Sequence, residues 1–119
     1  MSQILKNLPV GSYAVIFPSI SSGVDEEGHE RMLAELYGRV QEIEGFLGLE
    51  AASDSPFKLA VAYFDSLESI DTWRKNSEHI AAKNKARSTW LEDWQIRICR
   101  IEDVYGKSGS LGSDQSSLI

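Results

Sequence analysis

The chain contains the run Leu59-Ala-Val-Ala-Tyr-Phe64, which is rich in β-branched and aromatic residues and carries no charged side chain. A second run of the same character, Tyr13-Ala-Val-Ile-Phe17, lies near the N-terminus. Both runs predict β-strands. A strand with one solvated face alternates apolar with polar residues, and neither run does so. Both faces of these two strands are therefore expected to be covered.

The segment between the two runs predicts a helix and then a strand. Negative charge at Asp25–Glu27 suits the start of a helix, and apolar residues recur at helical spacing after it. These residues are Met32, Leu33, Leu36, Tyr37, Val40 and Ile43. Gly45 is a natural helix end. Phe46–Ala52 predicts the next strand, joined by a turn to the strand Phe57–Phe64.

The C-terminal half predicts a broken helix and a last strand. Residues 65–68 resemble a capping box, which opens a helix that continues through Trp73. A second helical stretch follows residues 76–77 and extends to about residue 89. Trp94–Tyr105 predicts the closing strand, with a bulge near Arg100 where the apolar alternation slips.

The predicted order is β-α-β-β-α-β. This order predicts an α+β, ferredoxin-like fold, with a four-stranded antiparallel sheet and both helices on one face. Residues 1–106 are expected to form a single domain, and residues 107–119, rich in Ser and Gly, a disordered tail. One chain supplies helices for one face only. The sheet of a second copy is the simplest cover for the other, so we expect a homodimer through the sheet faces.

Composition narrows the class of partner. The chain has 119 residues, a formal net charge of −6 and a pI near 4.8, which argue against nucleic acid and against an anionic membrane surface. Cys99 is the one cysteine, so no intramolecular disulfide is expected. The N-terminal residues lack the apolar run of a signal peptide, and no stretch is long enough for a membrane span. A cytoplasmic protein with a small-molecule partner is expected.

One stripe of residues predicts a binding pocket. His79, Ala82, Ala86 and Trp90 share one face of the second helical region, and Trp73 lies on the inward face upstream. Small side chains there would leave room over the sheet, and large ones would wall the space. The expected floor consists of alternate strand residues. They are Tyr13, Val15, Phe17, Leu59, Val61 and Tyr63.

A plainer interpretation stays open for each of these residues. His79 would then be a structural histidine, and the two tryptophans ordinary packing. His29 lies among acidic residues and is expected to be solvated, and Cys99 is expected to be a buried thiol. The spacing of the two histidines does not resemble a metal site.

At these residues the chain resembles the antibiotic biosynthesis monooxygenase family of dimeric α+β barrel proteins. The resemblance covers about residues 11–106. Besides the two opening runs it includes Glu44-Gly-Phe-Leu-Gly-Leu-Glu50, Ile70-Asp-Thr-Trp73, Glu78-His79 with Ala82 and Trp90, and Val104-Tyr105-Gly106. Glu44 stands where the family often has a proline, and the first strand lacks the Asn of the haem-degrading members.

The resemblance implies a monooxygenase that acts on a small aromatic, quinone-like or otherwise hydrophobic molecule without a cofactor. His79 would be the base or hydrogen-bond partner and Tyr63 an orienting hydroxyl. The substrate-binding residues would be Trp73, Trp90, Tyr13, Phe17, Ala82 and Ala86. The alternatives are a non-catalytic homodimer that binds a small ligand or haem, and a structural dimer whose own side chains fill the pocket.

Overall fold

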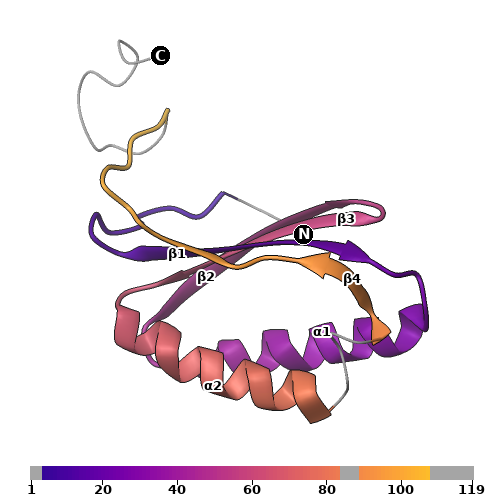
Figure 1. Ribbon diagram of the computed structural model, residues 1–119. Helices are drawn as coiled ribbons and strands as arrows, with labels where there is room; N and C mark the ends of the chain where they lie inside the picture. The colour runs from indigo at the N-terminus through magenta and orange to yellow at the C-terminus, as the bar shows by residue number, and fades with distance from the viewer. Residues whose placement is uncertain (1–3, 84–88, 108–119) are drawn as a thin grey trace.

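The computed structural model describes residues 4–83 and 89–107, with the side chains of residues 82 and 83 left aside. The described elements are β1 (Tyr13–Ser21), α1 (Glu26–Val40), β2 (Phe46–Asp54), β3 (Phe57–Phe64), α2 (Leu67–Lys83), β4 (Leu91–Trp94) and β5 (Arg97–Arg100). They form two layers, with both helices packed beneath one face of the sheet (Figure 1). The predicted disordered tail lies outside the described residues, apart from Lys107.

The sheet confirms the ferredoxin-like α+β fold. Its strand order is β2-β3-β1-β4, and β5 also pairs with β1. Each described pairing is antiparallel. The two apolar runs of the sequence are the two central strands, because β1 pairs with β3 from Tyr13 opposite Phe64 to Ile20 opposite Phe57.

The last strand differs from the prediction. It is two short strands, β4 and β5, separated at residues 95–96 rather than one strand over 94–105. Pro18 explains the break. The Gln95 N–H donates to the Pro18 carbonyl at 3.1 Å, but proline has no N–H to return the second bond of that pair. The ladder therefore stops opposite Pro18 and resumes at β5.

The prediction of a broken second helix is wrong. α2 is continuous across residues 76–77, because both polar side chains bond back to carbonyls of the preceding turn. Asn76 Nδ2 donates to the Thr72 carbonyl at 3.0 Å, and Ser77 Oγ donates to that of Arg74 at 3.1 Å. Its start is as predicted: the Ser69 N–H donates to Ser66 Oγ at 3.1 Å, so Ser66 caps the helix.

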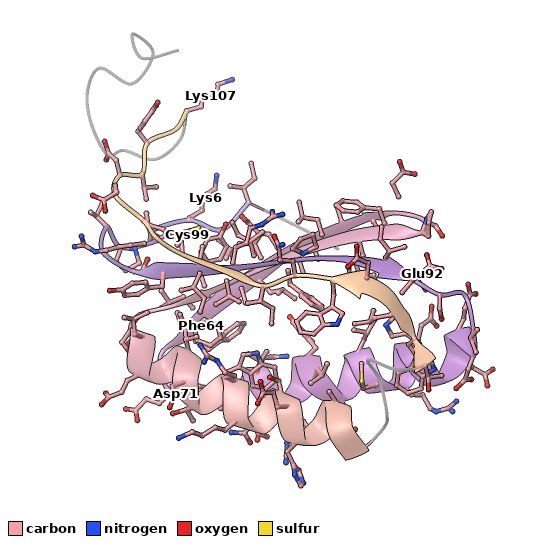
Figure 2. All side chains as sticks on the ribbon, in the orientation of Figure 1. Lys6, Phe64, Asp71, Glu92, Cys99 and Lys107 are labelled. Carbon is pink, nitrogen blue, oxygen red and sulfur yellow. The ribbon has the colours of Figure 1, made fainter. Side chains whose placement is uncertain are left out.

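Two hydrophobic clusters fill the space between the layers. The first cluster is formed by Met32, Ile80 and Trp90, with Leu33, Leu36 and Ala81 against it. The second cluster is formed by Val40, Phe64 and Ile70, with Tyr13, Val15, Ile43, Phe46, Ala62 and Trp73 against it. Phe64 is fully buried and lies between the sheet and the helices (Figure 2). The first cluster therefore joins the two helices to each other and to Trp90, and the second cluster holds both helices to the sheet.

The other sheet face is not covered by helices. Phe64 points toward the helices, so residues of β3 an odd number of positions away from it point to the other face. Phe57 and Leu59 lie on that other face, where they are 42% and 36% exposed. Cys99 lies on this open face (Figure 2) and is exposed. The prediction of a buried thiol is therefore wrong for the single chain. Neither helix that the structure describes is long and apolar enough to cross a membrane.

Candidate functional site

His29 and Trp90 form a stacked pair under one end of the sheet. Their ring centroids are 5.6 Å apart and the ring planes differ by 7°, so the rings are parallel and offset. His29 is 9% exposed and Trp90 6%. The expectation that His29 is solvated is therefore wrong. α1 turns this side chain inward, one turn before Met32 of the first cluster.

Asp25 holds the Trp90 ring against the start of α1. Its carboxylate caps α1, since Oδ1 accepts a hydrogen bond from the Gly28 N–H at 3.2 Å. The other oxygen, Oδ2, accepts from Trp90 Nε1 at 3.2 Å. Gly28 allows this close approach, because a Cβ there would lie 3.0 Å from Trp90 Cζ2 and would overlap the Asp25 carboxylate. The indole is thereby anchored to the start of the helix that carries His29.

A row of side chains on the sheet faces this pair. Lys58 on β3 is opposite Ser19 on β1, which is in turn opposite Trp94 on β4. Directly opposed residues share a sheet face. Lys58 is an even number of positions from Phe64 on β3 and so points to the same face, which means that the row points toward the helices. Phe17 lies on the same face, with its ring centroid 6.4 Å from that of Trp94. We call His29, Trp90, Asp25, Lys58, Ser19, Phe17 and Trp94 the His29 site.

The imidazole of His29 is held in its neutral form. Burial lowers its pKa below the usual 6.5, and the positive charge of Lys58 lowers it further. Glu30 and Glu26 act in the opposite direction but less strongly. A neutral imidazole can accept a proton at neutral pH. The site therefore brings a proton acceptor, a cation and aromatic rings to the helix-facing side of the sheet.

The two predicted catalytic residues lie elsewhere. His79 is on α2 and exposed. Tyr63 is adjacent to Phe64 on β3, so it points to the open face and not toward the helices. Leu59 and Val61 alternate in step with Tyr63 and share that face. The prediction that these three residues share one floor with Tyr13 and Phe17 is therefore corrected.

The predicted substrate-binding residues are divided between several places. Trp73 and Tyr13 pack against the second cluster, whereas Trp90 belongs to the first cluster. Phe17 contacts Trp94 in the His29 site. Ala86 and the side chain of Ala82 lie outside the described residues. The described part of α2 reaches Lys83, and Trp90 follows the helical residue Thr89 and is buried.

A signal for His29 is present in the sequence. The apolar stripe of α1, counted back by one turn from Met32 and Leu33, falls on His29. Lys58 and Trp94 show no such signal, since their partners come from other strands. Within residues 4–83 and 89–107, no group of three or more His, Cys, Asp or Glu side chains is arranged to hold a metal ion.

Tyr63 has a structural partner that yields a testable consequence. Its hydroxyl donates to Glu50 Oε1 at 2.7 Å, and Glu50 Oε2 accepts from the Leu5 N–H at 2.9 Å. Burial, then the hydrogen bond to Glu50, raises the Tyr63 pKa from 10.0 to about 12. The folded state thus holds more protons than the unfolded state between these values. Stability is expected to be full below pH 10 and to fall as the pH rises toward 12.

Denaturant unfolding at a series of alkaline pH values measures this effect. Tyr63→Phe should flatten the alkaline loss of stability, while Tyr105→Phe, at an exposed position, should keep the wild-type profile. Equal profiles for wild type and Tyr63→Phe would contradict the assignment.

Comparison with known proteins agrees with this fold. The sequence matches no family model. It is 35% identical over 91 residues to the uncharacterised Bacillus subtilis protein YqjZ, covering 76% of this chain and 79% of that protein.

Solved structures with low sequence identity share the architecture. The structure of SnoaB from Streptomyces nogalater, a cofactor-independent oxygenase, superposes with a TM-score of 0.66 at 10% identity, over 82% of this chain and all of that one. A proposed antibiotic biosynthesis monooxygenase from Chloroflexus aurantiacus gives a TM-score of 0.57 at 16% identity, over 80% of this chain and 97% of that one. The chain therefore belongs to the same family as YqjZ, and its fold is that of the antibiotic biosynthesis monooxygenases.

Proposed function

We propose that the protein is a cofactor-independent monooxygenase that acts on a small aromatic, quinone-like or otherwise hydrophobic molecule at the His29 site. The observation that carries the proposal is the buried, neutral imidazole of His29, stacked on Trp90 between the sheet and the helices. The likeness to SnoaB supports the reaction class by fold alone.

The chemistry needs one proton acceptor and a dry, flat space. A phenol or an activated ring C–H would give its proton to the neutral His29 imidazole. The electron-rich anion that remains would react with dioxygen to give a peroxide, which then loses water. One oxygen atom stays in the product and the other leaves as water, while the substrate loses two hydrogen atoms and supplies all four electrons. Trp90, Phe17 and Trp94 offer aromatic surfaces suited to a planar ligand. In this proposal His29 takes the role that the sequence suggested for His79.

Oxygen uptake tests the proposal. Purified protein should consume dioxygen saturably with one or more members of a panel of quinols and hydroxylated anthrones. Mass spectrometry should show one oxygen atom gained by the organic product, and a chelator such as EDTA should not change the rate. Uptake no faster than in buffer across the panel would contradict the proposal.

The second candidate is non-catalytic binding of a hydrophobic ligand or haem in the same space. It is favoured by the same imidazole, because the neutral form is the one that ligates iron. In a haemin titration, a saturable Soret shift lost in His29→Gln and kept in His79→Gln would support haem binding. No shift, or a shift equal in both variants, would contradict it.

We also propose that the open sheet face is covered by a second copy of the chain. β3 presents the exposed apolar side chains Phe57 and Leu59 there, and Leu5 covers only the neighbouring region of β2, beside Gly48 and Glu50. A sheet face of this kind is expected to be buried in an assembly.

The test is the mass in solution, by light scattering. Wild type should have twice the 13.3 kDa of one chain, and Leu59→Asp should shift toward the monomer, because a buried unpaired carboxylate is costly. The matched control is Leu67→Asp, since Leu67 is 55% exposed on α2, and it should remain dimeric. A monomeric wild type, or an undisturbed Leu59→Asp dimer, would rule out this interface.

A further inference from the structure

Lys58 supplies a positive charge to the His29 site. It lies on the second position of β3, and the strand register puts it beside Ser19, which is 5% exposed, on the helix-facing side. Its side chain is half-buried. The His29 imidazole feels its charge across the space between the layers. Lys58 therefore lies on the side of the sheet where the proposed substrate would bind.

The Lys58 ammonium has no counter-ion in the described part of the chain. Ion pairs found there include Arg31–Glu27, Lys75–Asp71 and Arg100–Glu102, all on exposed surfaces. Among residues 4–83 and 89–107, no hydrogen bond or ion pair is made by the Lys58 side chain. This is notable in a chain with 18 acidic and 12 basic residues. A half-buried charge without a partner favours a ligand of the opposite charge.

From this placement we infer that Lys58 is a substrate-recognition residue, which pairs with an anionic oxygen of the aromatic ligand bound at the His29 site. The inference deepens the proposed function and rests on it. The oxygen would be a phenolate, an enolate or a carboxylate, since each is an acceptor for an ammonium group.

Lys58 and His29 would act on the same substrate in complementary ways. When the substrate gives its proton to the imidazole, a negative charge remains on the substrate oxygen. An ammonium beside that oxygen stabilises the charge. The proton stays on His29, and no bond to Lys58 forms. The substrate class is therefore an acidic aromatic molecule rather than a neutral hydrocarbon.

A pair of probes with the same ring system tests the inference. Lawsone, a hydroxynaphthoquinone, is an anion at pH 8, and its O-methyl ether is neutral. Binding is measured by tryptophan fluorescence quenching without oxygen, so that no turnover occurs. Wild type is expected to bind lawsone about tenfold more tightly than the ether, as a hydrogen bond to a charged group allows. Lys58→Met should lose this preference, and Lys58→Arg should keep it.

Lys75→Met is the matched control, because it removes the same charge from the outer side of α2. It should keep the wild-type preference. The visible spectrum of bound lawsone gives a second measurement. Bound lawsone should become protonated at a lower pH in wild type than in Lys58→Met, because the ammonium group favours the anion.

Equal affinity of wild type for the two probes, no binding of either, or an unchanged preference in Lys58→Met would overturn the inference. It is separable from the proposed function. A preference that depends on Lys58, in a protein that consumes no oxygen, would leave the inference standing and remove the monooxygenase. Turnover without such a preference would leave the monooxygenase standing and remove the inference about Lys58.

Discussion

Replacing Phe64 by alanine is expected to destabilise the fold by about 3–5 kcal/mol, the cost of truncating a buried phenylalanine. Phe64 is fully buried in the second cluster, where its ring lies 5.6 Å from that of Phe46. It joins β3 to both helices through Val40 and Ile70. A typical domain is stable by only about 5–15 kcal/mol, so this one side chain decides whether the helices stay on the sheet.

Denaturant unfolding at one fixed protein concentration measures the loss, because the proposed dimer would make stability depend on concentration. Tyr37→Ala is the control, since Tyr37 on α1 is an aromatic residue that is 51% exposed. It should cost less than about 1 kcal/mol. Similar losses in both variants would contradict the assignment of Phe64 to the core.

His29→Gln is expected to lower the rate of oxygen uptake by roughly a hundred- to ten-thousand-fold, the usual contribution of a general base. Glutamine keeps a polar side chain in the space beside Trp90 but cannot take a proton at neutral pH. The exposed His79 provides the comparison, and His79→Gln should retain the wild-type rate. Equal rates in wild type and His29→Gln would remove His29 from the chemistry.

The same histidine predicts a dependence on pH. The groups that act on it are Lys58 from β3, which lowers its pKa together with burial, and Glu26 and Glu30 from α1, which raise it. Asp25 lies at the edge of the Trp90 ring, where its carboxylate accepts the indole N–H. The folded pKa is below the unfolded 6.5, so the unfolded state binds more protons between the two values. Stability should therefore fall as the pH falls from 6.5 through the folded pKa.

Two measurements check this sign. The rate of oxygen uptake in wild type should persist below pH 6.5 and decline only near the lowered pKa. The free energy of unfolding should fall more steeply with acid in wild type than in His29→Gln. An unchanged acid profile in His29→Gln would show that another group titrates in this range.

The architecture followed from the sequence because its signals are local. The runs at β1 and β3, the acidic start of α1 and the turn at residues 53–56 each specify one element. The element order then allows few topologies. The break between β4 and β5 was missed because it depends on Pro18, which lies on another strand.

The site could be predicted only in part. β3 is apolar on both faces, so its pattern does not say whether Lys58 and Phe64 or Leu59 and Tyr63 point toward the helices. We expected Leu59 and Tyr63 to point toward the helices, and this wrong expectation placed Tyr63 in the predicted pocket. Helical spacing likewise put His79 on one face with Trp90, whereas His79 is exposed and Trp90 is buried. The inward position of His29 was detectable, because it continues the stripe of α1.

The central claim is that a small aromatic molecule binds beside His29 and Trp90, between the sheet and the helices. The indole N–H signals of the three tryptophans, followed by nuclear magnetic resonance during titration with the neutral quinone menadione, test it most directly. The Trp90 and Trp94 signals should shift saturably, and the signal of Trp73, which packs in the second cluster, should shift less. No saturable shift at Trp90, or the largest shift at Trp73, would contradict the claim.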